Sequence, residues 1–133
     1  MKRDLSRTKR RGSASMELAV LLPLLLFLFV AAVDFTRIFH FSQVIGNCAR
    51  NGALYGSNLT TYTSPYSTLQ AAALADATGL SPQPTVTSTT GTDSSGNPFV
   101  RVTVAWQYQA ITGFPGIPNT VNISRTVQMR VAP

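Results

Sequence analysis

The longest uninterrupted hydrophobic pattern is an uncharged apolar run of sixteen residues, Leu18–Val33. As an α-helix rising 1.5 Å per residue, the run spans about 24 Å, slightly less than the roughly 30 Å hydrocarbon core of a bilayer. Extending the helix to residues 13–35 closes this gap and predicts a membrane span. Pro23 lies inside the run, where a transmembrane helix tolerates proline with a kink or a loosened turn.

After the apolar run the pattern becomes amphipathic. Apolar or small residues recur at alternating spacings of three and four, which places them on one helical face: Ile38, Phe41, Ile45, Cys48, Gly52 and Tyr55. We therefore expect one long helix from about Ser13 to Tyr55, whose part over residues 36–56 continues beyond the membrane. The stripe is predicted to be an internal packing surface, with a contact between subunits as the alternative.

Residues 57–133 read as a small, separate α+β region. A polar loop containing Pro65 is followed by a short helix within 67–79, with Ser67 as its cap, Gly79 as its stop and an inward face made of Leu69, Ala73 and Ala77. Alternating apolar and polar residues then predict strands near 85–90, 99–110 and 120–132. Arg125 interrupts the apolar side of the last strand, at a sheet edge or against a partner.

These elements predict an α+β fold in which a long N-terminal helix, transmembrane in its first half, packs against a short helix and a small antiparallel sheet of about three strands. The expected organisation is a basic leader over residues 1–12, the membrane segment over 13–35, its extracytoplasmic continuation over 36–56 and a small exported domain over 57–133.

The net charge of +6 first suggests nucleic acid as a partner, but the distribution of charge excludes it. Six basic residues and one acid precede Gly12, whereas the rest of the chain holds five arginines, four acids and no lysine. The positive-inside rule then places the N-terminus in the cytoplasm and the bulk of the chain outside.

The chain offers little material for catalysis. Its single cysteine, Cys48, cannot form an internal disulfide and is expected to be a packing residue. His40 is also the only residue of its kind, and few acids remain for paired-carboxylate chemistry. We expect no enzyme activity, no metal site and no cofactor.

Glu17 lies at the edge of the apolar run. Its position helps to distinguish three hypotheses about how the basic leader over residues 1–12 is processed. An ordinary secretory signal would be cleaved after Ala32, and a signal anchor would stay uncleaved. The third interpretation is cleavage on the cytoplasmic side after Gly12, which makes Ser13 the first residue. Its new α-amino group then lies one helical turn from Glu17, since positions 13 and 17 share a face.

This pattern resembles a known family. Gly12 followed by "SASMEL" resembles the processing site of type IV pilin-like proteins, and the continuation to "CARNGALYG" resembles the N-terminal region of TadE-like proteins. These are pseudopilins or minor pilins of the tight-adherence (Tad, Flp) pilus system. The elements that carry the resemblance are Gly12, Glu17, Pro23, the pair Asp34 and Arg37, and "CARNGA" from Cys48 to Ala53. Asp34 and Arg37 are also spaced for an i,i+3 ion pair at the membrane boundary.

The resemblance implies a pilus-assembly subunit that a prepilin peptidase cuts between Gly12 and Ser13. Its membrane helix, marked by Leu18, Pro23 and Val33, would enter assembly with Glu17 paired to the amine of another subunit. The implied partners are the prepilin peptidase, other Tad pilins and pseudopilins, the inner-membrane assembly platform and the lipid bilayer. An uncleaved, single-pass anchored binding or adhesion module is the alternative, and a secreted enzyme or carbohydrate-binding protein is more distant.

Overall fold

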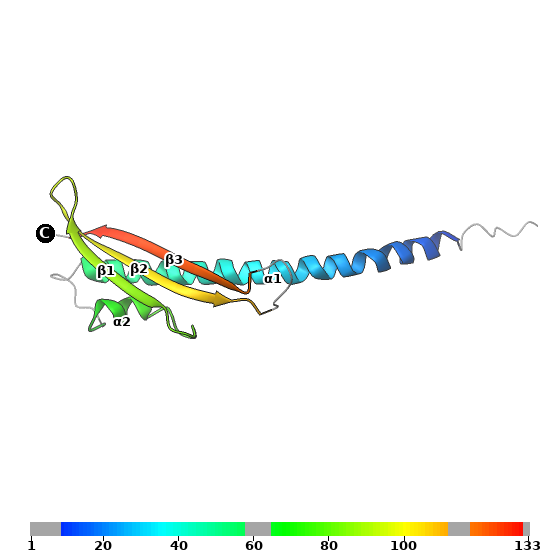
Figure 1. Cartoon of the computed structure of the whole chain (residues 1–133), viewed down its shortest axis with the longest axis horizontal. Helices are drawn as coiled ribbons and strands as arrows, with labels where there is room; N and C mark the ends of the chain where they lie inside the picture. Colours follow the sequence, from blue (N-terminus) through cyan, green and yellow to red (C-terminus); the bar gives the residue numbers. More distant parts are fainter. Residues whose placement is uncertain (1–8, 58–64, 112–117, 132–133) are drawn as a thin grey trace, which may run out of the picture.

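The computed structural model describes residues 9–57, 65–111 and 118–131, with side chains from residue 14 onward. The chain folds into two layers (Figure 1), a long helix and a sheet with a short second helix beside it. In chain order the elements are α1 (Lys9–Ser57), α2 (Leu69–Leu74), β1 (Thr85–Thr92), β2 (Pro98–Gln109) and β3 (Thr120–Arg130). The predicted α+β fold class is confirmed.

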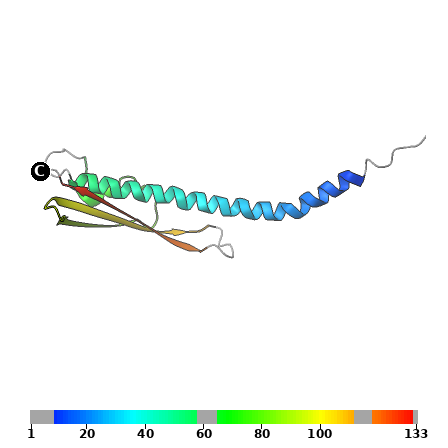
Figure 2. The ribbon, with the colours of Figure 1, turned by 90° about the horizontal axis from the view of Figure 1, so that it is seen from above.

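Helix α1 is slightly longer than the sequence predicted. It begins at Lys9 rather than Ser13 and ends at Ser57 rather than Tyr55. Its 49 residues extend for about 74 Å at 1.5 Å per residue. Figure 2 shows a bend in the blue, N-terminal part of the helix, the part that contains Pro23. A proline removes one backbone hydrogen bond and crowds the preceding turn, which accounts for a bend there.

The three strands form an antiparallel meander in the order β1-β2-β3. In the register Val86 pairs with Val104, and Val104 pairs with Arg125 on the other side. Side chains of paired residues share a face, so alternate residues of β2 all point toward α1. The three predicted strands are therefore confirmed, with bounds that differ by one or two residues.

The core lies between the second half of α1 and the inner face of the sheet (Figure 2). Its fully buried members come from both layers: Ile45, Cys48, Ala49, Ala53, Val100, Val102, Val104 and Tyr108. The apolar stripe of α1 is thus an internal packing surface, as predicted. The polar residues Gln43, Asn47 and Arg50 of the same helix are exposed.

Helix α2 differs from its prediction at both ends. Its N-cap is Thr68, not Ser67, and the Thr68 side chain accepts a hydrogen bond from the backbone N–H of Ala71 at 3.1 Å. The helix ends at Leu74, because the backbone N–H of Ala77 bonds the carbonyl of Leu74 and begins a tighter i→i+3 turn. Gly79 follows with a φ of 87°, the left-handed conformation that glycine adopts most easily.

The turn between β1 and β2 is organised by Asp93. One carboxylate oxygen accepts hydrogen bonds from the backbone N–H groups of Ser95 and Asn97, at 2.9 and 2.8 Å. The bond from Asn97 is the main cause that lowers the pKa of Asp93, since it stabilises the charged form. Gly96 completes the turn with a φ of 81°.

Arg125 has a defined partner in the fold. Its guanidinium group donates a hydrogen bond to the hydroxyl of Ser42 on α1. The register explains the position, because Arg125 is opposite Val104 and therefore on the face of the sheet that covers the helix. The sequence placed Arg125 either at a sheet edge or against a partner. Both descriptions apply, because β3 is an edge strand and Arg125 contacts Ser42 of the same chain.

Candidate functional site

The first part of α1 exposes apolar side chains on every side. Between Leu18 and Phe29 each large hydrophobic residue is at least 40% exposed. A helix that is hydrophobic all round needs an apolar environment, either a membrane or the core of a larger protein. Among the described residues there is one helix, Ala14–Ser57, that is long and apolar enough to cross a membrane.

The folded domain begins where this segment ends. Residues 14–33 precede Asp34, the first residue of α1 that is fully buried. These residues extend for about 30 Å, which matches the thickness of the hydrocarbon core. The exposed part of α1 is therefore about as long as the hydrocarbon core is thick. The α+β domain packs on the remaining part of the helix, from Asp34 onward.

The predicted processing and assembly residues occupy consecutive turns at the start of α1. Gly12 and Ser13 lie within the helix, and Glu17 follows at an exposed position. Positions 13 and 17 are four residues apart in one continuous helix, so they share a face as the spacing predicted. Cleavage and pairing through these residues stay predictions.

The two charged residues that follow the apolar segment, Asp34 and Arg37, differ in exposure. Asp34 is only 2% exposed, whereas Arg37 is exposed. The guanidinium carbon of Arg37 lies 5.9 Å from the centre of the Phe41 ring, within cation–π range. Their i,i+3 ion pair stays a prediction.

A series of small residues near the end of α1 allows three elements to approach closely. A Cβ atom added at Gly52 would lie 3.0 Å from Cβ of Ala73 in α2 and 3.1 Å from Cγ1 of Val102 in β2. At Gly56 it would lie 2.9 Å from Cγ2 of Val100. The small side chains in "CARNGALYG" therefore serve packing, since larger ones would push the sheet and α2 away from α1.

Cys48 belongs to this packed region and is fully buried. Burial raises the pKa of its thiol, and the negative charge of Asp76 adds to the effect. Asp76 in turn accepts a hydrogen bond at 2.8 Å from the amide of Asn51. A buried thiol with a raised pKa is unreactive near neutral pH, which agrees with the packing role predicted for Cys48.

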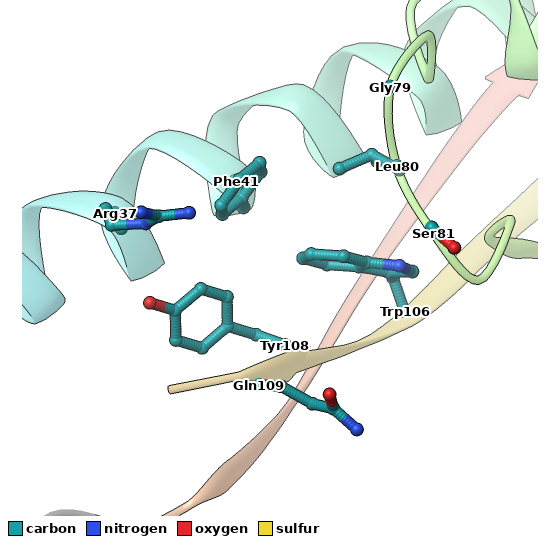
Figure 3. Close-up of a pocket in the computed structure, with 8 residues that line it drawn as sticks. All are labelled: Arg37, Phe41, Gly79, Leu80, Ser81, Trp106, Tyr108 and Gln109. Atoms are coloured by element: carbon teal, nitrogen blue, oxygen red, sulfur yellow. The ribbon is translucent and has the colours of Figure 1, made fainter. Parts of the chain in front are cut away.

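The described part of the chain also contains an open hollow of about 210 Å³ between α1, β2 and the loop after α2. Its lining is shown in Figure 3 and comes from three elements: Arg37, Phe41, Gly79, Leu80, Ser81, Trp106, Tyr108 and Gln109. The rings of Phe41 and Trp106 are 5.0 Å apart, and those of Phe41 and Tyr108 are 5.7 Å apart. The sequence did not predict this hollow, although Trp106 and Tyr108 lie in the strand predicted near 99–110.

Two polar atoms in the wall of the hollow behave differently. The indole N–H of Trp106 donates a 2.7 Å hydrogen bond to the carbonyl of Pro82, which fixes the ring against the loop. The hydroxyl of Tyr108 is buried and has no hydrogen-bond partner among the described residues.

Within the same residues no group of three His, Cys, Asp or Glu side chains is placed to hold a metal ion.

Together these features define a class of protein: a bilayer-length apolar helix that carries a small α+β domain on its second half. Residues 12–54 match the family model of TadE-like proteins, so the predicted resemblance is confirmed over this segment, about a third of the chain. The match begins at Gly12 and ends within the small-residue region of α1. Searches among curated proteins and solved structures gave no significant match.

Proposed function

We propose that the chain is a pseudopilin or minor pilin that takes part in assembly of a Tad pilus. The observation that carries this proposal is the family match over residues 12–54. It begins at Gly12, the predicted cleavage site, and includes the exposed apolar residues from Leu18 to Phe29. In the proposed precursor the basic leader stays in the cytoplasm, α1 crosses the inner membrane and the α+β domain is outside.

In this proposal a prepilin peptidase cuts between Gly12 and Ser13. Removal of the leader deletes six of the chain's eleven basic side chains and creates an α-amino group at Ser13. The charges that hold the precursor at the cytoplasmic face are thereby lost, and one new cation appears beside the apolar segment. The mature helix is then free to leave the bilayer with the assembling pilus.

Glu17 supplies the polar contact that fixes the assembly register. A charged residue at the bilayer centre costs about 2.5–3.5 kcal/mol on the insertion scale, and less near the interface. The terminal amine of a neighbouring subunit offsets this cost by pairing with the Glu17 carboxylate. Apolar contacts alone do not drive helices together in lipid, so assembly depends on packing and on such polar pairs.

The proposed partners are the prepilin peptidase, other Tad pilins and pseudopilins, and the inner-membrane assembly platform. The role is structural, and we propose no enzymatic activity. A second candidate, an uncleaved membrane-anchored binding or adhesion module, is favoured by one observation. Helix α1 begins at Lys9 and runs through Gly12 without interruption, as an intact anchor would.

Two substitutions separate the candidates. Gly12→Ala should leave an unprocessed precursor and abolish pili, whereas an anchored module would function unchanged. Gly46→Ala is the matched control, because a Cβ atom at Gly46 meets nothing within 4 Å. Glu17→Gln should be processed normally yet assemble poorly, as judged by immunoblot for processing and by electron microscopy for pili. Normal pili from Gly12→Ala, with the leader retained, would exclude the pilin role.

A further inference from the structure

We propose that the hollow beside Arg37 binds the phosphate-containing headgroup of an anionic phospholipid, in the leaflet that faces the folded domain. The proposal rests on α1 crossing a bilayer as described above, and it assigns a ligand to residues to which the proposed function gives no role. Its evidence is the depth of the hollow in the membrane, the chemistry of its lining and the exposed apolar residues around it.

The depth follows from the geometry of α1. Arg37 is four residues beyond Val33, the end of the apolar run, which places it about 6 Å further along the helix. The headgroup layer of a bilayer is about 5–8 Å thick on each side, the difference between the whole bilayer and its hydrocarbon core. A span that ends at Val33 therefore places Arg37, which lines one side of the hollow, among the headgroups.

The lining offers hydrogen-bond donors and no negative charge. Arg37 is the only charged residue among the lining side chains, and its planar guanidinium suits a phosphate group. Ser81 and Gln109 also line the hollow, and both are uncharged. Figure 3 shows the hydroxyl of Tyr108 on the Arg37 side of the hollow, and this hydroxyl lacks a partner among the described residues although Tyr108 is only 1% exposed.

The size of the hollow limits what enters it. A volume of about 210 Å³ is below the roughly 300–1,000 Å³ of pockets that enclose whole small molecules. A headgroup with its acyl chains left in the bilayer fits this limit. The lining also contains Trp106 and Tyr108, the two residue types that are enriched at membrane–water interfaces.

Exposed apolar side chains surround this part of the domain. Phe35 and Phe39 on α1 are 65% and 67% exposed, and Ile111, just after β2, is 65% exposed. Phe35 and Phe39 lie on either side of Arg37 in sequence, so they belong to the same depth. Side chains of this type bury themselves at the boundary between headgroups and acyl chains, which would hold the hollow against the lipid surface.

Trp106 provides a specific probe, because it lines the hollow and is the only tryptophan in the chain. The full chain is reconstituted into nanodiscs of phosphatidylcholine with an increasing fraction of phosphatidylglycerol, and quenching of Trp106 by neutral acrylamide is measured. We expect phosphatidylglycerol to protect Trp106. Arg37→Gln should raise the lipid fraction needed for half-maximal protection about fivefold, from the usual contribution of one arginine near an anionic surface.

Two further variants identify the contacts. Tyr108→Phe keeps the ring and should weaken the protection, since it removes the unpartnered hydroxyl. Arg50→Gln is the matched control, because Arg50 is also exposed on α1 but does not line the hollow. It should behave as the unmodified chain. Protection that is equal in Arg37→Gln and the unmodified chain overturns the proposal.

The remaining arms separate the possible sources of the anion. Millimolar glycerol phosphate in discs of pure phosphatidylcholine should give no protection, and protection there would assign the hollow to a free phosphate. A chain that does not elute with the discs overturns both the membrane span and the lipid site. A chain that elutes with them but shows no dependence on phosphatidylglycerol overturns the lipid site alone.

Discussion

Replacing Gly52 by alanine tests whether close approach of three elements, and not flexibility, accounts for glycine in the second half of α1. A Cβ atom at Gly52 would contact Cβ of Ala73 at 3.0 Å and Cγ1 of Val102 at 3.1 Å. The first neighbour is fixed to the backbone of α2, and the second is a methyl group of a β-branched side chain in the central strand, whose χ1 rotation is restricted. The same substitution at Gly46 meets nothing within 4 Å.

Both substitutions stabilise the protein by restricting the unfolded chain, but only Gly52→Ala also overpacks the core. Alanine in place of glycine inside a helix stabilises by about 0.5–1 kcal/mol, because the unfolded chain loses freedom. Overpacking a closely packed core costs about 1–3 kcal/mol. We therefore expect Gly46→Ala to stabilise the protein and Gly52→Ala to be about 1–3 kcal/mol less stable than Gly46→Ala.

The assay is urea unfolding of the full chain in detergent micelles, followed by Trp106 emission. Trp106 is suitable because it packs against Phe41 of α1 at a ring distance of 5.0 Å, so separation of the sheet from the helix changes its environment. Gly56→Ala extends the series, since its Cβ atom would lie 2.9 Å from Val100. Equal stabilisation by Gly46→Ala and Gly52→Ala would refute the packing argument.

Three other predictions follow from single side chains. Tyr108→Phe should raise the free energy of unfolding by about 1 kcal/mol in micelles without anionic lipid, because it removes a buried hydroxyl that has no partner among the described residues. Cys48 should resist iodoacetamide at neutral pH until urea unfolds the domain, and rapid labelling of folded protein would contradict its burial. The pKa of Asp93 is lowered in the fold, so its stabilisation is present above the ordinary aspartate pKa and is lost as pH falls through the lowered value. Asp93→Asn should remove this dependence from acid-unfolding curves.

The long helix and the strands were predictable because their hydrophobic periods are regular. The stripe from Ile38 to Tyr55 keeps helical spacing over several turns, and the valines of β2 alternate strictly. The N-cap of α2 was harder to predict, because two neighbouring residues can take this role. Ser67 and Thr68 are both good N-caps, and the sequence does not show which hydroxyl the turn brings to the N–H of Ala71.

Contacts between distant residues lay beyond the sequence. The partner of Arg125 is Ser42, which is 83 residues away and becomes a neighbour only through the register of β3 and the position of α1. The burial of Asp34 and the hollow likewise depend on how the sheet lies on the helix. The roles of Gly12, Ser13 and Glu17 depend on other proteins, so the fold of one chain does not test them.

The central claim is cleavage after Gly12, and the most direct measurement is N-terminal sequencing of the mature protein isolated from pili and from membranes of the native host. The proposed function predicts a sequence that begins at Ser13, with Glu17 at the fifth position. Retention of Met1 would indicate an uncleaved anchor, and a sequence that begins at Val33 would indicate ordinary secretion. Either of these results would contradict the account.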